Sequence, residues 1–188
     1  MNNEERKKQA DVLLYEIGLL NKIKEYGEPH IIGSYRMDIM AWNDLDIDIL
    51  NNQMSIDKLY ELSRFTFKAF KPIWYEAKQE TNSEGETIWF HGFETMITGT
   101  LWNVDLWFLD EKTILKAEKY CDHISEKIKS NQTYAEIIFK IKETLIGNKQ
   151  YGYGKYTSNN VYKAVLEHKV KSVDEFFNYC ENRPFLHI

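Results

Sequence analysis

Hydrophobic and polar residues follow one another along the chain in blocks of different period, and these blocks predict the order of its elements. Apolar residues at helical spacing, among them Ile17 and Leu20, predict an amphipathic helix over Asn3–Tyr26 that stops at Gly27. A short apolar run at His30–Ile32 then predicts a strand that leads into a tight turn.

The middle of the chain has the period of two that is typical of strands, with one helical block inserted. Asp44–Leu50 alternates acidic and aliphatic residues and predicts a strand, whereas Ser55–Phe70 predicts a helix. Two aromatic-rich runs, Pro72–Gln79 and Thr87–Phe93, predict a hairpin because a polar, glycine-containing turn separates them. Leu101–Leu109 predicts one further strand.

The rest of the chain has a helical pattern, interrupted near Gly147–Tyr156. Two segments, Thr133–Glu136 and Ser172–Glu175, have the hydroxyl and the glutamate of a capping box, which supply hydrogen-bond partners for the free amides at a helix start. They predict where two helices begin. The fold class that follows is α/β, of the α+β kind: a mixed sheet flanked by helices, then a helical region. We expect a core over residues 1–110 and a C-terminal helical region over residues 111–188.

Composition narrows the classes of function. The chain has 188 residues, 43% hydrophobic and 14% aromatic, so it can bury a sizeable core. A formal net charge of -5 argues against binding to nucleic acid, because phosphate contacts need clustered Lys and Arg. A small-molecule or protein substrate fits this charge better.

The pattern of cysteines and apolar stretches bears on the compartment. Cys121 and Cys180 lie far apart and predict no disulfide framework, which fits a reducing compartment. The first residues lack the apolar segment of a signal peptide, and no stretch approaches the roughly 18 apolar residues of a membrane span. We therefore expect a cytoplasmic protein without a membrane partner.

The acidic strand carries the first candidate chemistry. Side chains two apart share one face of a strand, so Asp44, Asp46 and Asp48 project to the same side. Like charges so close oppose folding unless a cation lies among them. A divalent metal resolves this conflict, and Mg²⁺ binds one or two carboxylates while it keeps positions for water and phosphate oxygens.

Two further features complete the candidate site. Gly33–Ser34 follows a predicted strand and offers a flexible backbone and a hydroxyl at a turn, where free amides attract phosphate. Asp105 is one acid in an otherwise apolar and aromatic strand, where an unpaired carboxylate is costly to bury.

The order and spacing of these residues resemble the nucleotidyltransferase superfamily, which includes DNA polymerase β and antibiotic nucleotidyltransferases. Eleven residues separate Gly33–Ser34 from Asp46 and Asp48, and Asp105 follows later on a separate strand. The resemblance implies a nucleotidyltransferase-like fold. It also implies that Gly33 and Ser34 contact a triphosphate and that Asp46, Asp48 and Asp105 are catalytic and bind two Mg²⁺ ions.

The resemblance spans residues 31–109 and implies an enzyme. We expect a metal-dependent nucleotidyltransferase that moves a nucleoside monophosphate from an NTP, by analogy ATP, to a hydroxyl of a small molecule. An antibiotic is one candidate acceptor. The alternatives are a non-catalytic nucleotide-binding or protein-interaction module of the same fold, and an enzyme that modifies RNA or protein.

The register of the acidic strand has two solutions. Asp44 and Asp46 also fit the spacing, with nine residues after Ser34, but apolar residues continue through Ile49–Leu50 and favour Asp46 and Asp48. The alternative is that these acids have no catalytic role and lie on an exposed edge strand, where their charge deters aggregation.

Overall fold

The computed structural model describes residues 1–51, 53–152 and 154–181. The chain divides into two compact units, Met1–Cys121 and Asp122–Ile188. The division falls inside helix α5 (Glu111–Ser130), whereas the sequence pattern places the change to a helical region at the start of that helix.

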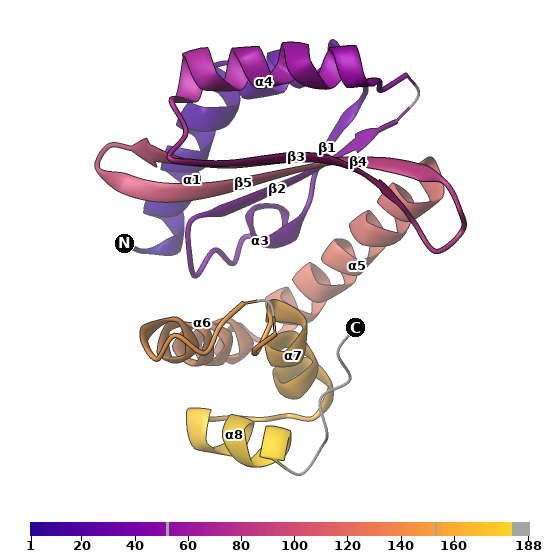
Figure 1. The fold of residues 1–188 in the computed structure, drawn as a ribbon. Coiled ribbons are helices and arrows are strands. Elements are labelled where there is room, and N and C mark those ends of the chain that lie inside the picture. Colours follow the sequence, from indigo (N-terminus) through magenta and orange to yellow (C-terminus); the bar gives the residue numbers. More distant parts are fainter. Residues whose placement is uncertain (52, 153, 182–188) are drawn as a thin grey trace. The chain divides into compact units, whose positions relative to one another are not determined.

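A five-stranded mixed sheet forms the centre of the first unit (Figure 1). Its strands are, in chain order, β1 (Pro29–Ile31), β2 (Asp44–Leu50), β3 (Trp74–Thr81), β4 (Thr87–Ile97) and β5 (Thr100–Leu109). The order across the sheet is β1-β2-β5-β4-β3, in which β2 and β5 are parallel and the other neighbours are antiparallel. The parallel pair brings together two segments that are far apart in the sequence.

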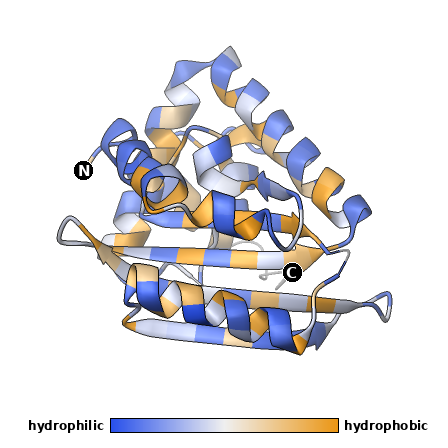
Figure 2. Ribbon diagram, turned by 90° about the horizontal axis from the view of Figure 1, so that it is seen from above, coloured by the Kyte–Doolittle hydropathy of each residue, from blue (hydrophilic) through white to orange (hydrophobic). Residues whose placement is uncertain are grey.

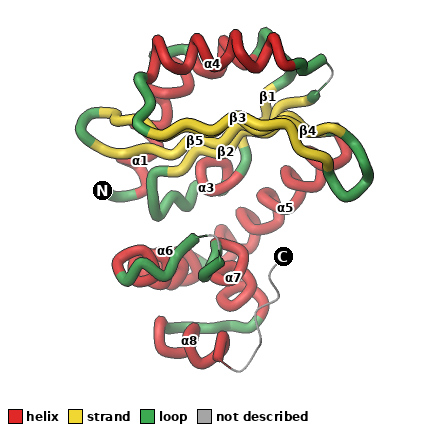
Figure 3. The backbone as a smooth tube through the Cα atoms, in the orientation of Figure 1, coloured by secondary structure: helices red, strands yellow, loops and turns green. Residues whose placement is uncertain are grey.

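Alternation along the strands gives the sheet one apolar and one polar face, and the alternation of colours along the strands is visible in Figure 2. Leu45, Ile47 and Ile49 of β2 are fully buried, as are Val104 and Leu106 of β5. Helix α4 (Ile56–Phe70) lies over one face of the sheet, and the short helix α3 (Gly33–Arg36) lies on the other side (Figure 3). The face under α4 is the core.

The N-terminal helical segment packs onto the same core but is not one continuous helix. Helix α1 (Asn3–Asp11) passes into a π-helical turn (Val12–Glu16), and α2 (Leu19–Ile23) follows. The break falls at Gly18, whose φ of 90° is in the left-handed region that glycine tolerates. Periodicity predicts the apolar face of this segment but not the break, because the pattern continues through it.

Helix α1 also holds the segment that follows α3. Asp38 has a positive φ of 57°, and its carboxylate accepts hydrogen bonds from Asn3 Nδ2 at 2.9 Å and Lys7 Nζ at 3.0 Å. Tyr35 Oη donates to Asp11 Oδ1 at 2.7 Å. These contacts fix the loop between β1 and β2.

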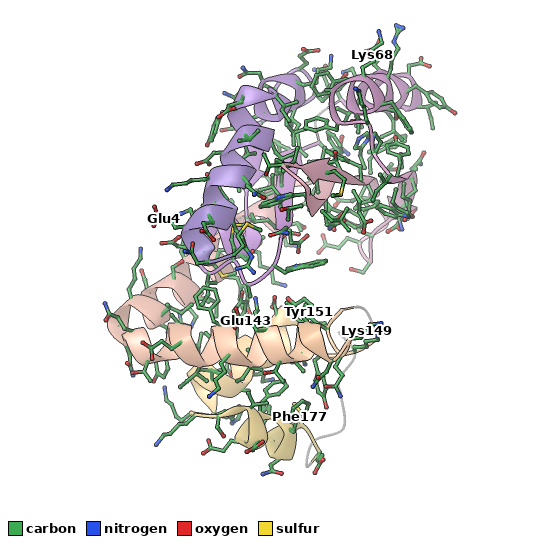
Figure 4. All side chains as sticks on the ribbon, turned by 90° about the vertical axis from the view of Figure 1, so that its left-hand side faces the viewer. Glu4, Lys68, Glu143, Lys149, Tyr151 and Phe177 are labelled. Carbon is green, nitrogen blue, oxygen red and sulfur yellow. The ribbon has the colours of Figure 1, made fainter. Side chains whose placement is uncertain are left out.

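The second unit is helical, with α6 (Gln132–Gly147), α7 (Ser158–Tyr162) and α8 (Val173–Glu181). The predicted start at Ser172 is confirmed, because its Oγ accepts from the Glu175 amide at 3.1 Å. The other helix starts one residue before the predicted cap, since Asn131 caps α6. Labelled side chains of this unit in Figure 4 include Glu143 and Phe177.

Two findings concern expectations about the compartment. Cys121 and Cys180 are buried free thiols. Among the helices in the described part of the chain, none is long and apolar enough to cross a membrane.

Candidate functional site

Three carboxylates meet on the polar face of the sheet. Asp44 and Asp46 project from β2 and Asp105 from β5, and one ligand oxygen from each lies within 4.8 Å of the others. Asp46 and Asp105 are direct partners in the parallel register of the two strands. We call Asp44, Asp46 and Asp105 the carboxylate cluster.

The local sequence positions the cluster through the two-residue period of each strand. On β2 the acids alternate with Leu45 and Ile47, which are fully buried in the core. On β5, Asp105 lies between the buried residues Val104 and Leu106. Burial of the aliphatic residues on one face therefore places the acids on the other.

The cluster is electrostatically costly without a cation. Burial, followed by the charge of the neighbouring Asp44, raises the pKa of Asp105 to about 6. Glu76 and Glu94 act in the same direction, while a hydrogen bond with Asn103 lowers this pKa. The Asn103 amide also donates to Asp44 Oδ1 at 2.8 Å. A carboxylate set of this kind offers the hard oxygen ligands that Mg²⁺ prefers.

The Gly33 turn lies directly against the cluster. Gly33 is the first residue of α3 and has a φ of 64°. A Cβ atom at Gly33 would overlap Asp46 Oδ2, so a side chain here would displace the carboxylate. The Ile32 amide donates to the Asp46 carbonyl at 3.1 Å, which joins the turn to β2. The structure thus brings Gly33 and Asp46 together, as the spacing suggests.

Ser34 is the second residue of this turn and is half-buried. Its carbonyl accepts from the Ile39 amide at 2.9 Å, which closes the loop after α3. The roles of Gly33 and Ser34 toward a triphosphate remain predictions.

Asp48, which the sequence favours as a metal ligand, lies outside the carboxylate cluster. It is 3% exposed and pairs with His30 in the antiparallel register of β1 and β2. The pKa of Asp48 is raised to about 7, mainly by burial; His30 opposes this shift and Glu118 adds to it. The acid that lies beside Asp46 and Asp105 is instead Asp44, whereas the buried Asp48 interacts with His30 and Glu118. The structure thus groups Asp44, and not Asp48, with Asp46 and Asp105, while the metal-ligand roles of these acids remain predictions.

Glu118 is a residue of this region that the sequence pattern does not reveal. Its Oε1 lies 3.1 Å from His30 Nδ1 and 3.0 Å from Arg36 Nη1, so α5 is tied to β1 and to α3. Glu118 stands 88 positions after His30 and has ordinary helical neighbours. Only the tertiary fold makes it part of this region.

Comparison with known proteins bears on the fold. No family model and no curated protein matches the chain. A solved mutant of the Cid1 poly(U) polymerase bound to MgATP matches with a TM-score of 0.61 and 14% identity, over 87% of this chain and 50% of the polymerase. The same polymerase bound to MgGTP matches with a TM-score of 0.58, 14% identity and the same coverage, 87% and 50%.

A cytoplasmic RNA terminal U-transferase matches with a TM-score of 0.56 and 15% identity, over 87% of this chain and 48% of the transferase. The chain spans about half the length of these structures. The expected nucleotidyltransferase-like fold, a mixed sheet flanked by helices, is confirmed.

Proposed function

We propose that the chain is a metal-dependent nucleotidyltransferase that moves a nucleoside monophosphate from an NTP to a hydroxyl group. The observation that carries the proposal is the carboxylate cluster, with one oxygen of each of Asp44, Asp46 and Asp105 within 4.8 Å. The position of Gly33 against Asp46 supports it, because only a residue without a side chain allows the turn to approach this carboxylate so closely.

The chemistry of the donor set fits divalent metal ions. Burial and the neighbouring Asp44 raise the pKa of Asp105, so ionisation of the cluster is costly, and bound cations would offset this cost. Bound Mg²⁺ would supply charge stabilisation for the attacking hydroxyl and the leaving pyrophosphate. Asp44, Asp46 and Asp105 are the residues that would hold the metal, and Gly33 and Ser34 are the proposed neighbours of the triphosphate.

A small molecule remains the proposed acceptor, and ATP the proposed donor by family analogy. The net charge of -5 supports a small molecule over a polyanion. Glu76 and Glu94 also lie near enough to raise the pKa of Asp105, so the surroundings of the cluster carry further negative charge. Such surroundings favour an uncharged or cationic acceptor, and an antibiotic with free hydroxyl groups is one candidate of this class.

A free RNA 3′ end is the second candidate acceptor. Its specific support is the likeness of this fold to a poly(U) polymerase and to an RNA terminal U-transferase. The expectation that nucleic acid is no partner has no support from these neighbours. The acidity of the chain and of the cluster surroundings argues for the small molecule.

One experiment tests the reaction and separates the acceptors. The chain is incubated with Mg²⁺ and each α-labelled NTP, together with a panel of hydroxylated small molecules, a short RNA with a free 3′ hydroxyl, or no acceptor. We expect label transfer and pyrophosphate release with a small molecule, and none from an Asp46→Asn variant. Transfer to RNA alone, lost steeply as salt increases, would favour the second candidate.

The non-catalytic alternative makes a different prediction. A nucleotide-binding module would bind a non-hydrolysable NTP with Mg²⁺ in calorimetry but would transfer no label to any acceptor. Absence of both binding and transfer would contradict the proposed function.

A further inference from the structure

Strand β3 is an edge strand with an open outer side. Its eight residues, Trp74–Thr81, pair with β4 without interruption from the Trp74–Glu94 pair to the Thr81–Thr87 pair. Within the described residues β4 is its only neighbour in the sheet. A long, regular edge without proline or a bulge presents free backbone groups that can pair with another strand.

Helix α4, which lies next to β3 on the core face of the sheet, has three stripes instead of the usual two. The first stripe is buried and consists of Leu59, Leu62, Thr66 and Phe70. The second is charged and exposed and consists of Asp57, Glu61, Arg64 and Lys68; Lys68 extends away from the helix in Figure 4. The third contains exposed apolar residues at helical spacing: Ile56 is 51% exposed, Tyr60 is 71% exposed and Phe67 is 52% exposed.

The apolar stripe and the edge strand form one surface. A groove of about 440 Å³ runs between them, lined by the stripe of α4 and by Tyr75, Ala77 and Gln79 of β3. The Phe67 ring lies over Tyr75, with 5.0 Å between the ring centroids. We call this surface the β3–α4 edge. The other exposed stripe of α4 is charged, so the exposed Tyr60 and Phe67 form an apolar patch that is confined to this surface.

The opposite face of β3 carries a charge pattern that is complementary to itself. Lys78 Nζ lies 3.0 Å from Glu76 Oε1 and 2.8 Å from Glu80 Oε1. If a second β3 pairs antiparallel about a two-fold axis at Ala77, Glu76 falls opposite the partner's Lys78, and Lys78 opposite the partner's Glu76. An axis at Glu76 would place Glu against Glu, and an axis at Lys78 would place Lys against Lys.

An axis at Gln79 would also pair opposite charges, but it would overlap fewer residues of the strand. Among the axes that pair opposite charges, the axis at Ala77 therefore gives the longest overlap of the two β3 strands. It also leaves neither strand with an open edge.

We propose that the β3–α4 edge binds a second copy of this chain, with antiparallel pairing of the two β3 strands about Ala77. The two sheets become continuous, and the apolar stripes of the two α4 helices cover both grooves. Because α4 and β3 run in opposite directions along the groove, Tyr60 lies near the axis and Ile56 faces the partner's Phe67. Such an isologous contact closes on itself and leaves no free β3 edge.

The charge pattern permits a test by exchange of charges. In Lys78→Glu, a two-fold pair would place Glu opposite Glu; in Glu76→Lys, it would place Lys opposite Lys. We expect the unchanged chain to sediment as a dimer and each single variant as a monomer. An equimolar mixture of the two variants should form a heterodimer, and the double variant Glu76→Lys/Lys78→Glu should dimerise again, because opposite charges then meet.

A second variant probes the helix side of the same surface. Tyr60→Glu should also give a monomer, whereas Leu115→Glu, which alters a 43% exposed leucine of α5, should remain a dimer. Circular dichroism and melting curves confirm that each variant is folded; exposed ion pairs such as those of Lys78 contribute little stability, so folding should persist. A monomeric unchanged chain would overturn the proposal, as would dimers that survive both Lys78→Glu and Tyr60→Glu. The measurement uses no nucleotide, so its outcome is independent of the proposed function.

Discussion

Asp46 and Asp105 stand directly opposite each other on the parallel strands β2 and β5, and a glycine flanks each of them. Gly33 lies against Asp46, and a Cβ at Gly92 would overlap the Phe90 ring and lie 3.0 Å from Asp105 Oδ1. Gly92 is also the register partner of Asp105 on β4. The two carboxylates therefore have room on the sheet face because both neighbouring positions lack side chains.

Gly33→Ala tests this arrangement. The added Cβ would overlap Asp46 Oδ2, and the φ of 64° is unfavourable for alanine. We expect a loss of about 1–2 kcal/mol in the free energy of unfolding from the backbone alone. Displacement of Asp46 should in addition abolish binding of Mg²⁺-NTP, measured by calorimetry.

Gly99→Ala is the matched control for backbone strain. Gly99 also has a positive φ, 80°, but its Cβ would meet no atom within 4 Å. It should lose similar stability and keep full nucleotide affinity. If Gly33→Ala binds Mg²⁺-NTP as well as Gly99→Ala does, the turn does not position Asp46.

Asp105→Asn should abolish transfer while the fold remains intact. The folded pKa of about 6 exceeds the ordinary value of 3.8, so ionisation of this acid lowers stability as pH rises from about 4 through 6. The amide variant does not have this cost and should melt at the same or a higher temperature than the unchanged chain at pH 8 without metal.

Melting curves with Mg²⁺ and nucleotide complete that test. Ligand that binds only the folded state raises the melting temperature, so the unchanged chain should gain stability and Asp105→Asn should not. A lower melting temperature of Asp105→Asn at pH 8 without metal would instead indicate that Asp105 belongs to a structural ion pair.

The choice between Asp44 and Asp48 gives a third prediction. Asp44→Asn should weaken Mg²⁺-NTP binding at least tenfold, which corresponds to about 1.4 kcal/mol, because Asp44 belongs to the carboxylate cluster. Asp48→Asn should keep most of the affinity, since that acid lies beside His30 and outside the cluster. The reverse order of affinities in metal titrations would restore Asp48 as the ligand.

Local pattern predicts much of the fold. The alternation of acids and aliphatic residues gives the observed bounds of β2, Asp44–Leu50. The hairpin and the last strand are also found, although β4 extends to Ile97, beyond the predicted end at Phe93. The extension keeps the same alternation. The buried Thr95 hydroxyl has a hydrogen-bond partner there, because its Oγ1 donates to the Phe70 carbonyl at 2.5 Å. That contact joins β4 to α4, and no local signal contains it.

The carboxylate cluster could be predicted only in part. Strand alternation and the cost of isolated charge single out Asp46 and Asp105, and the resemblance to the nucleotidyltransferase superfamily adds Gly33. The identity of the third acid depends on the register of β5 against β2, and Asp44 and its partner Asn103 are 59 positions apart in the sequence. The environment of Asp48 likewise depends on an electrostatic interaction with Glu118, which is distant in the sequence. Such pairings result from tertiary packing, which a one-dimensional pattern does not encode.

His91 gives the last prediction, which concerns stability alone. This side chain is fully buried, and its Nε2 lies 2.9 Å from Thr66 Oγ1. Burial lowers its pKa from 6.5 to about 3. Between those values the unfolded chain binds a proton at His91 and the folded chain does not, so stability falls as pH decreases through 6.5 toward 3.

His91→Gln removes this titration. Denaturant unfolding at pH 7.5 and pH 4.5 should show that the unchanged chain loses on the order of 2 kcal/mol more than the variant on acidification. The carboxylates titrate in both the unchanged chain and His91→Gln, so their contribution to the loss of stability cancels in the difference between the two proteins. His123→Gln, at an exposed position of α5, controls for the loss of a histidine and should behave like the unchanged chain. Equal losses in the unchanged chain and in His91→Gln would mean that His91 accepts a proton in the folded state, in conflict with its burial against Thr66.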